Sequence, residues 1–190
     1  TSRKEQTAKE LGQAGVGEFV ILSTCNRTEI YFAGQDIIQT KNTVVTYCEA
    51  VFDSDIARYL YSYEKRNAIT HLFRVACGLD SLVLGEDQIL GQVKDAHAFS
   101  LAHKISGKVL NKVFRESITF AKKAKSEHKM SDCPLSISSI AVKYISQQIG
   151  GLSGKNVLIM GMGKIGKLLL RYLYDRQDVD IYLTKRVHKS

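Results

Sequence analysis

The spacing of apolar positions along the chain predicts an alternation of helices with short strands. Apolar residues recur every three to four positions in 36–52 and 66–77, which is the period of a helix with one buried face. Further helices are predicted at 3–14, 88–103, 106–128, 137–149 and from Lys164 onward. Runs of β-branched, aromatic and aliphatic residues predict strands at 18–22, 28–33, 59–63, 157–160 and 178–186. The pattern indicates an α/β protein.

A short segment, Ser131–Ser136, divides the chain. It holds Pro134, the only proline of the sequence, and Gly150 and Gly151 end the helix that follows. We therefore predict an N-terminal α/β domain over 1–132, a connecting helix over 133–152, and the start of a Rossmann-type domain over 153–190. A doubly wound domain needs more than two strands, so we expect this last domain to be cut short here.

Composition narrows the class of protein. The chain has 190 residues, 44% of them hydrophobic and 24% charged, which is ordinary for a globular protein. A formal net charge of +8 favours an anionic partner such as a nucleic acid or a nucleotide. No apolar run approaches the ~18 residues of a membrane span. The four cysteines lack metal-site spacing and are too few for a disulfide scaffold, so we expect no metal and a reduced, cytoplasmic setting.

The glycine-rich stretch at 161–166 predicts a dinucleotide site. It reads G-M-G-K-I-G, follows the strand 157–160 and opens a helix, which is the context that this motif requires. Gly161 permits the tight turn, Gly163 lets a pyrophosphate approach the backbone, and Gly166 allows close helix–strand packing. The candidate cofactor-binding residues here are Gly161, Gly163, Lys164, Ile165 and Gly166. A purely structural glycine turn is the alternative.

The end of the second strand indicates which dinucleotide is bound. An acidic residue there would hold the ribose 2′-hydroxyl of NAD. This chain has Lys185 and Arg186 instead, and cations favour a 2′-phosphate. We therefore predict NADPH, held in part by Lys185 and Arg186. An exposed basic strand end is the alternative.

The stretch LSTCNR at 22–27 sets a cysteine directly after a buried strand. A lone cysteine is most often a packed structural residue. Arg27, two residues on, favours a reactive thiol, because a nearby cation lowers a thiol pKa and the thiolate is the nucleophile. Arg27 is equally suited to hold a substrate carboxylate. His71 is a candidate neighbour of Cys25, although a histidine on an amphipathic helix is more often a packed or surface residue.

A cysteine nucleophile combined with a nicotinamide cofactor suggests a definite class of reaction. The thiolate attacks an activated acyl group to form a thioester, and reduction of the thioester gives an aldehyde. Two other functions stay open. One is a cysteine-dependent acyl hydrolase or transferase with a structural dinucleotide site, and the other is a non-catalytic, NADP-sensing RNA-binding module.

Three stretches together resemble the glutamyl-tRNA reductase family. They are LSTCNRTEIYF at 22–32, HLFRVACGLDSLVLGEDQILGQVKDA at 71–96, and the serine-rich helix leading into KNVLIMGMGKIGK. The resemblance covers nearly the whole chain. It implies NADPH-dependent reduction of glutamyl-tRNA to glutamate 1-semialdehyde, the first committed step of tetrapyrrole biosynthesis. It also implies a homodimer formed through a domain absent from these residues, and the next enzyme of the pathway as a further partner.

The resemblance also assigns roles by position. Cys25 falls on the nucleophile of the family, Thr24 and Arg27 on residues that help to hold the glutamyl substrate, and His71 on the catalytic-site histidine. The remaining matches are polar pocket positions: Ser81, Glu86 and Gln88. Simpler roles for these three are a loop turn, a helix cap and a surface residue, respectively. Glu29 is interpreted as part of the strand only.

The chain departs from the family pattern at several points. A first strand with a Gly-His-Lys/Arg-Thr type of sequence is absent. The second strand ends in Lys185-Arg186-Val187, where the family usually has Asn-Arg-Thr. Arg186 keeps its place, but the Asn and Thr contacts to a phosphate are lost.

Overall fold

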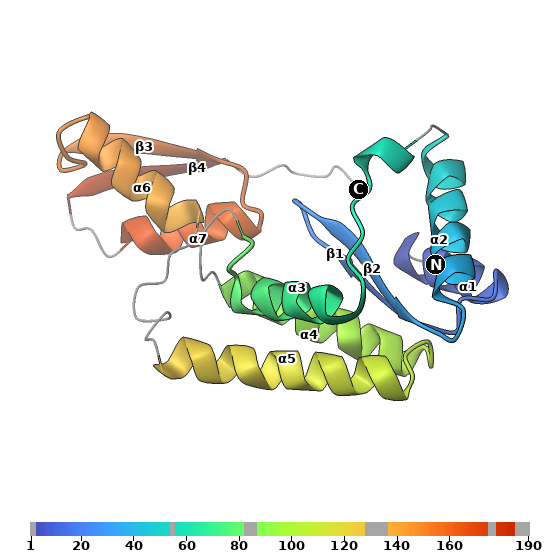
Figure 1. Cartoon of the computed structure of the whole chain (residues 1–190). Coiled ribbons are helices and arrows are strands. Elements are labelled where there is room, and N and C mark those ends of the chain that lie inside the picture. The colour runs from blue at the N-terminus through green and yellow to red at the C-terminus, as the bar shows by residue number, and fades with distance from the viewer. Residues whose placement is uncertain (1–2, 54–55, 82–86, 128–136, 175–177, 185–190) are drawn as a thin grey trace. The chain divides into compact units, whose positions relative to one another are not determined.

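The computed structural model describes residues 3–53, 56–81, 87–127, 137–174 and 178–184 (Figure 1). Contacts divide the chain into two compact units, 1–130 and 131–190. The fold is a mixture of helices and two small sheets. Among the described helices, none has the length and apolar character needed to cross a membrane.

A two-stranded antiparallel hairpin lies at the centre of the first unit. Strand β1 (Glu18–Ser23) pairs with β2 (Thr28–Ala33), and Ser23 opposite Thr28 closes the loop between them. Four successive residues of β1, 19–22, are buried, so both faces of this strand are covered. The apolar run at 19–22 therefore forms a strand without the alternation of apolar and polar residues that is typical of a sheet with one solvent-exposed face.

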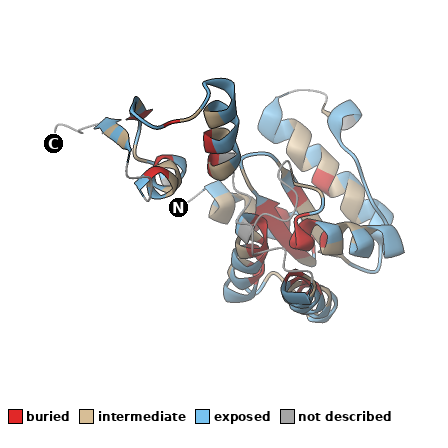
Figure 2. Cartoon of the chain, turned by 90° about the vertical axis from the view of Figure 1, so that its left-hand side faces the viewer, coloured by how far each residue is buried: buried red, intermediate tan, exposed pale blue. Residues whose placement is uncertain are grey.

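Helices cover the two faces of the hairpin. On one side, α1 (Arg3–Gln13) and α2 (Ile37–Phe52) pack against Phe19 and Ile21. On the other side, Val20 and Leu22 pack against α3 (Lys65–Cys77), α4 (Asp87–Ala102) and α5 (Lys108–Glu127). Figure 2 shows the buried residues gathered on the hairpin and on the helix sides that face it.

Local contacts set where the helices begin and end. The Asp36 side chain accepts a hydrogen bond from the Gln39 N–H at 2.9 Å and caps α2. Helix α5 is capped from a distant part of the chain, because the Glu18 carboxylate accepts the Leu110 N–H at 2.8 Å. Gly78 has φ of 76° and ends α3 in a left-handed turn, a conformation that glycine adopts at low cost.

Within the described residues, the predicted elements are confirmed with one exception; residue 128 of the predicted helix 106–128 and residues 185–186 of the predicted strand 178–186 lie outside them. The predicted strand at 59–63 is wrong, because a 3-10 turn, η1 (Ala57–Tyr59), precedes a segment that pairs with no strand. The reason lies in its tyrosines. The Tyr61 hydroxyl donates to Glu29, and the Tyr63 ring lies on His71, so side-chain contacts rather than backbone pairing hold the segment.

The second unit is smaller. It consists of α6 (Ile137–Gln148), β3 (Lys155–Met160), α7 (Lys164–Tyr174) and β4 (Val179–Thr184). The two strands are parallel and in register from Lys155 opposite Val179 to Met160 opposite Thr184. The buried core is made of Val142, Leu152, Ile159 and Leu173. A β-α-β unit with a glycine turn after its first strand is therefore present.

Candidate active site

Cys25 lies at the tip of the hairpin and is exposed. Thr24 organises this tip, because its hydroxyl accepts the backbone N–H groups of Asn26 (3.2 Å) and Arg27 (3.1 Å). The Thr24 N–H donates in turn to the Arg27 carbonyl at 2.8 Å. A hydroxyl that replaces backbone partners in this way fixes a tight turn. The turn presents the thiol of Cys25 to solvent.

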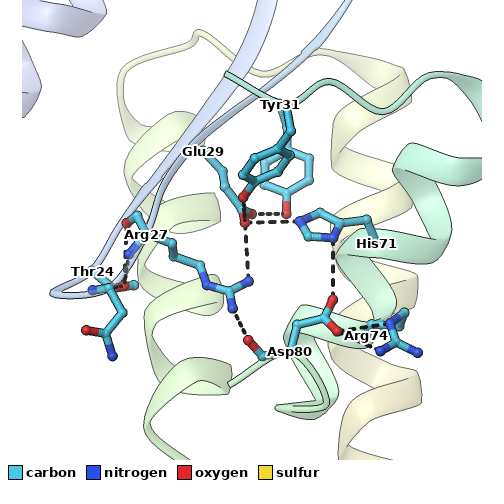
Figure 3. A network of polar contacts seen from close by, with 9 residues as sticks. Thr24, Arg27, Glu29, Tyr31, His71, Arg74 and Asp80 are labelled. Atoms are coloured by element: carbon cyan, nitrogen blue, oxygen red, sulfur yellow. Dashed lines mark hydrogen bonds and ion pairs between the residues drawn. The ribbon is translucent and has the colours of Figure 1, made fainter. Parts of the chain in front are cut away.

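Glu29 is the centre of a buried polar network (Figure 3). Its Oε1 accepts hydrogen bonds from Arg27 Nη1 (3.2 Å) and from the Tyr61 hydroxyl (3.0 Å), and it lies 3.0 Å from His71 Nε2. Its Oε2 accepts the Tyr31 hydroxyl at 2.5 Å. A carboxylate with only 8% of its surface exposed needs such partners, because an unpaired buried charge is costly.

The surroundings of Glu29 favour its charged form. Burial alone raises the pKa of a carboxyl group. Here the hydrogen bonds from Tyr31, His71 and Tyr61, together with the charge of His71, outweigh burial and hold the pKa of Glu29 below its usual range. The same contacts raise the pKa of the tyrosine hydroxyls that bond Glu29. Burial, reinforced by the charge of Glu29, raises the pKa of Tyr61 to about 12 and that of Tyr31 further.

Asp80 closes the network from the end of α3. Its backbone carbonyl accepts a hydrogen bond from Arg27 Nη2. Its Oδ2 lies 3.4 Å from His71 Nδ1, and its Oδ1 accepts Arg74 Nη2 at 2.7 Å. The left-handed turn at Gly78 redirects the chain after α3 and so places Asp80 beside the hairpin.

Tyrosine rings cover His71. The Tyr63 ring centroid lies 4.6 Å from that of His71, and the Tyr61 centroid lies 6.0 Å away. The imidazole is therefore held between carboxylates on its edges and an aromatic ring on its face. Its side chain is only 13% exposed.

The structure brings together some of the predicted site residues. Thr24, Arg27 and His71 share the network, and Cys25 lies in the same turn as the first two. Arg27 makes its hydrogen bonds to Glu29 and Asp80, and among the described contacts none joins its guanidinium to the thiol.

The other predicted pocket residues are less closely tied to the network. Ser81 directly follows Asp80 and is half-buried, whereas Gln88 is exposed in the first turn of α4. Glu86 lies outside the described residues.

Five network members were not predicted: Glu29, Tyr31, Tyr61, Arg74 and Asp80. Glu29 does lie in a strand as interpreted, but its side chain has the additional role just described. The sequence held a usable signal. A carboxylate in a strand that pairs with a continuous apolar run is expected to be buried, and a buried carboxylate requires donors.

The other described cysteines, Cys48 and Cys77, are less exposed than Cys25. Burial raises the pKa of the Cys48 thiol, with the charge of Glu49 adding to the effect. Burial also raises the pKa of Cys77, against a smaller opposing effect of Lys125. Among the described residues, no group of three or more histidine, cysteine or acidic side chains could hold a metal ion.

The second unit carries the glycine turn. Gly161 has φ of 97°, and its N–H donates to the Thr184 carbonyl at 3.2 Å, which joins the turn to the end of β4. A Cβ on Gly166 would lie 2.0 Å from the Gly161 carbonyl oxygen, so a side chain is excluded there. At Gly163 a Cβ would meet nothing within 4 Å.

These features fit the phosphate end of a dinucleotide. The backbone at Gly163 is open to approach, and α7 begins at Lys164, so the unpaired N–H groups of its first turn lie next to the glycines. A pocket of about 540 Å³ borders the turn and includes Gly161, Gly163 and the half-exposed Ile165 in its lining. Lys185 and Arg186 lie outside the described residues, as does the side chain of Lys164.

Fold and site together define a class of protein. It is a two-unit α/β protein in which a hairpin turn exposes a thiol beside a buried acid–histidine–arginine network. A parallel β-α-β unit with a glycine turn follows in the chain.

Comparison with known proteins gives the family. The family described as "Glutamyl-tRNAGlu reductase, N-terminal domain" matches residues 1–128. The chain is 42% identical over 190 residues to a glutamyl-tRNA reductase of Clostridium novyi. This alignment covers all of the chain and 46% of the relative. It is 38% identical over 205 aligned residues to that of Alkaliphilus metalliredigens, again covering all of the chain and 46% of the relative. The chain belongs to the glutamyl-tRNA reductase family and spans about half the length of these relatives.

Proposed function

We propose that the protein containing this chain reduces glutamyl-tRNA to glutamate 1-semialdehyde with NADPH, and so begins tetrapyrrole synthesis. The family membership supports the substrate and the reaction. The observation that carries the proposal to particular residues is the exposed thiol of Cys25 in a turn anchored by Thr24 and Arg27.

Cys25 acts as the nucleophile in this proposal. The Cys25 thiol gives up its proton and attacks the carbonyl carbon of the glutamyl ester. The carbon–oxygen bond to the terminal ribose breaks, and the departing ribose oxygen takes up a proton and leaves as the tRNA hydroxyl. The glutamyl group is then held on Cys25 as a thioester. The thiol is exposed, so a large substrate such as a tRNA end has access to it.

Arg27 and Thr24 hold the glutamyl group. Arg27 carries five N–H donors, and the contacts between described residues engage Nη1 with Glu29 and Nη2 with Asp80. The remaining donors suit a carboxylate of the substrate. Ser81, Glu86 and Gln88 are further proposed contacts of the same pocket.

The second unit would hold NADPH as the start of a Rossmann-type domain. Gly161, Gly163 and Gly166 shape the turn, and backbone N–H groups at the start of α7 would hold the pyrophosphate. Lys185 and Arg186 are the proposed partners of the 2′-phosphate. When bound, NADPH supplies the hydride that turns the acyl group into an aldehyde.

The test uses the full-length protein, glutamyl-tRNA and NADPH, with semialdehyde as the readout. We expect Cys25→Ser to lower turnover by about a hundredfold or more, as loss of a covalent nucleophile typically does. Cys48→Ser, on the far side of the hairpin core, is the matched control and should keep turnover. Semialdehyde formation by Cys25→Ser at the wild-type rate would remove Cys25 from the mechanism.

Omitting NADPH separates the rival functions. A reductase that forms a thioester should release glutamate slowly without NADPH and produce semialdehyde with it. A hydrolase should release glutamate at the same rate in both cases, and a sensing module should do neither. The homodimer and the handover to a following enzyme stay predictions of the family resemblance.

A further inference from the structure

Both ring nitrogens of His71 face carboxylates, and Nε2 makes a hydrogen bond. Nε2 lies 3.0 Å from Glu29 Oε1, and Nδ1 lies 3.4 Å from Asp80 Oδ2 (Figure 3). An imidazole has only these two polar atoms. A general base needs a free nitrogen within hydrogen-bond reach of the proton that it removes. Among the described residues, both nitrogens of His71 face carboxylates, and no described contact joins either nitrogen to Cys25.

The contacts of His71 form part of a closed ring of four residues. Arg27 Nη1 donates to Glu29, Glu29 contacts His71, His71 contacts the Asp80 side chain, and the Asp80 carbonyl accepts from Arg27 Nη2. We call this set, Arg27, Glu29, His71 and Asp80, the polar ring. It joins the hairpin turn, β2, α3 and the segment after α3.

We propose that His71 and Asp80 are positioning residues that fix the Arg27 guanidinium through the polar ring, and that His71 is not the proton acceptor of Cys25. Two anchors on neighbouring nitrogens define the plane of a guanidinium. The remaining N–H donors of Arg27 then point in one direction before any substrate arrives. This inference deepens the proposed function, because it rests on Arg27 as the contact for the glutamyl group.

Charged and titratable groups surround His71 from every element that packs on it. Glu29 contributes from β2, Asp80 from the segment after α3, and Tyr61 and Tyr63 from the segment before α3. Arg27 pairs with Glu29 within the polar ring, and Arg74 pairs with Asp80 from outside it. Arg74 bonds Asp80 Oδ1 and leaves Oδ2 to His71, so it orients the carboxylate within the polar ring.

The first test measures the alkylation rate of Cys25 against pH in this 190-residue chain, with peptide mapping by mass spectrometry. The proposal expects the same midpoint for the wild type and His71→Gln, because His71 does not take the thiol proton. If His71 accepts that proton, the variant should lose about tenfold or more of its rate at neutral pH, because less of the reactive thiolate would form. That result would overturn the proposal.

The second test follows Arg27 directly. The proton exchange rate of its guanidinium N–H groups is measured by nitrogen-15 NMR in the wild type, Asp80→Asn and His71→Ala. We expect exchange to rise by about tenfold in each variant, and the double variant to add little, since coupled residues are not additive. Arg27→Lys assigns the signals. His103→Gln, at an exposed histidine beyond α4, is the matched control and should leave them unchanged.

The outcomes are independent of the proposed function, because neither measurement uses tRNA or NADPH. Unchanged Arg27 exchange in both Asp80→Asn and His71→Ala would refute the polar ring. Should His71→Ala fail to fold, as judged by circular dichroism, Asp80→Asn decides alone, because it keeps the shape of the side chain. The guanidinium N–H groups of Arg27 should exchange more slowly in His71→Gln than in His71→Ala, because glutamine keeps a donor toward Glu29. That result would support the proposal.

Discussion

Replacing Glu29 by glutamine tests the centre of the network. The substitution keeps size and shape but removes the charge that faces Arg27 and His71. A hydrogen bond to a charged group contributes about 1.5–3 kcal/mol. Loss of one partner of a buried ion pair typically costs about 3–5 kcal/mol. The Glu29 and Arg27 side chains are only 7% and 14% exposed, so solvent screens their interaction little. We expect Glu29→Gln to destabilise the first unit by about 3–5 kcal/mol, a large part of the roughly 5–15 kcal/mol of a domain.

The measurement must report the first unit alone. Hydrogen exchange of the backbone amides in β1 and β2, followed by mass spectrometry at pH 7, gives the opening free energy of the hairpin core. Glu116→Gln is the matched control, because Glu116 is exposed on α5. A loss below about 1 kcal/mol in Glu29→Gln, or an equal loss in Glu116→Gln, would refute the argument that this carboxylate holds the network together.

The pH dependence of the same quantity gives a second check. The pKa of Glu29 is lowered in the folded protein from an ordinary value of 4.5. A carboxyl group of this kind stabilises the fold fully above the ordinary value, and the stabilisation is lost as the pH falls through the lowered value. The wild type should therefore lose more stability than Glu29→Gln between neutral pH and the acid range below 4.5. Parallel curves for the two proteins would contradict the assigned pKa direction.

Three further predictions concern other parts of the chain. Iodoacetamide should label Cys25 faster than Cys48, whose pKa is raised by burial, and peptide mapping checks this; faster labelling of Cys48 would contradict the exposed turn. Gly166→Ala should destabilise the second unit in thermal unfolding and weaken NADPH binding in the full-length protein, because the new Cβ would clash with the Gly161 carbonyl oxygen. Gly163→Ala is the control for folding, because a Cβ there has free space. Phe114→Ala should destabilise the first unit by about 3–5 kcal/mol in urea unfolding, because Phe114 is fully buried against the hairpin; a loss under about 1 kcal/mol would contradict this packing.

Much of the fold could be predicted from the sequence because it depends on local spacing. The strands at 18–23 and 28–33 and most helices follow directly from apolar periodicity. The prediction of a strand at 59–63 failed because tyrosines at alternating positions give the same pattern as a strand. The tyrosines instead contact Glu29, 32 residues away in the sequence, and His71 in the helix that follows, and the segment itself carries no sign of either contact.

The candidate site could be predicted only where a motif stands on consecutive residues. The turn with Thr24, Cys25 and Arg27 is local, and its geometry follows from one hydroxyl. The roles of Glu29 and Asp80 arise from tertiary contacts across more than forty residues, for example the 3.0 Å contact between Glu29 and His71. The sequence therefore did not reveal the tertiary contacts that support the turn.

The double-sided burial of the hairpin constrains how this protein can evolve. Val20 and Leu22 share one face with Tyr31 and Glu29, whereas Phe19 and Ile21 share the other with Phe32 and Ile30. Side chains in a strand alternate between faces, so inserting or deleting one residue in β2 would exchange the two sets. The carboxylate would then enter the apolar core under α1 and α2. Length changes in β2 should therefore be tolerated only in pairs of residues.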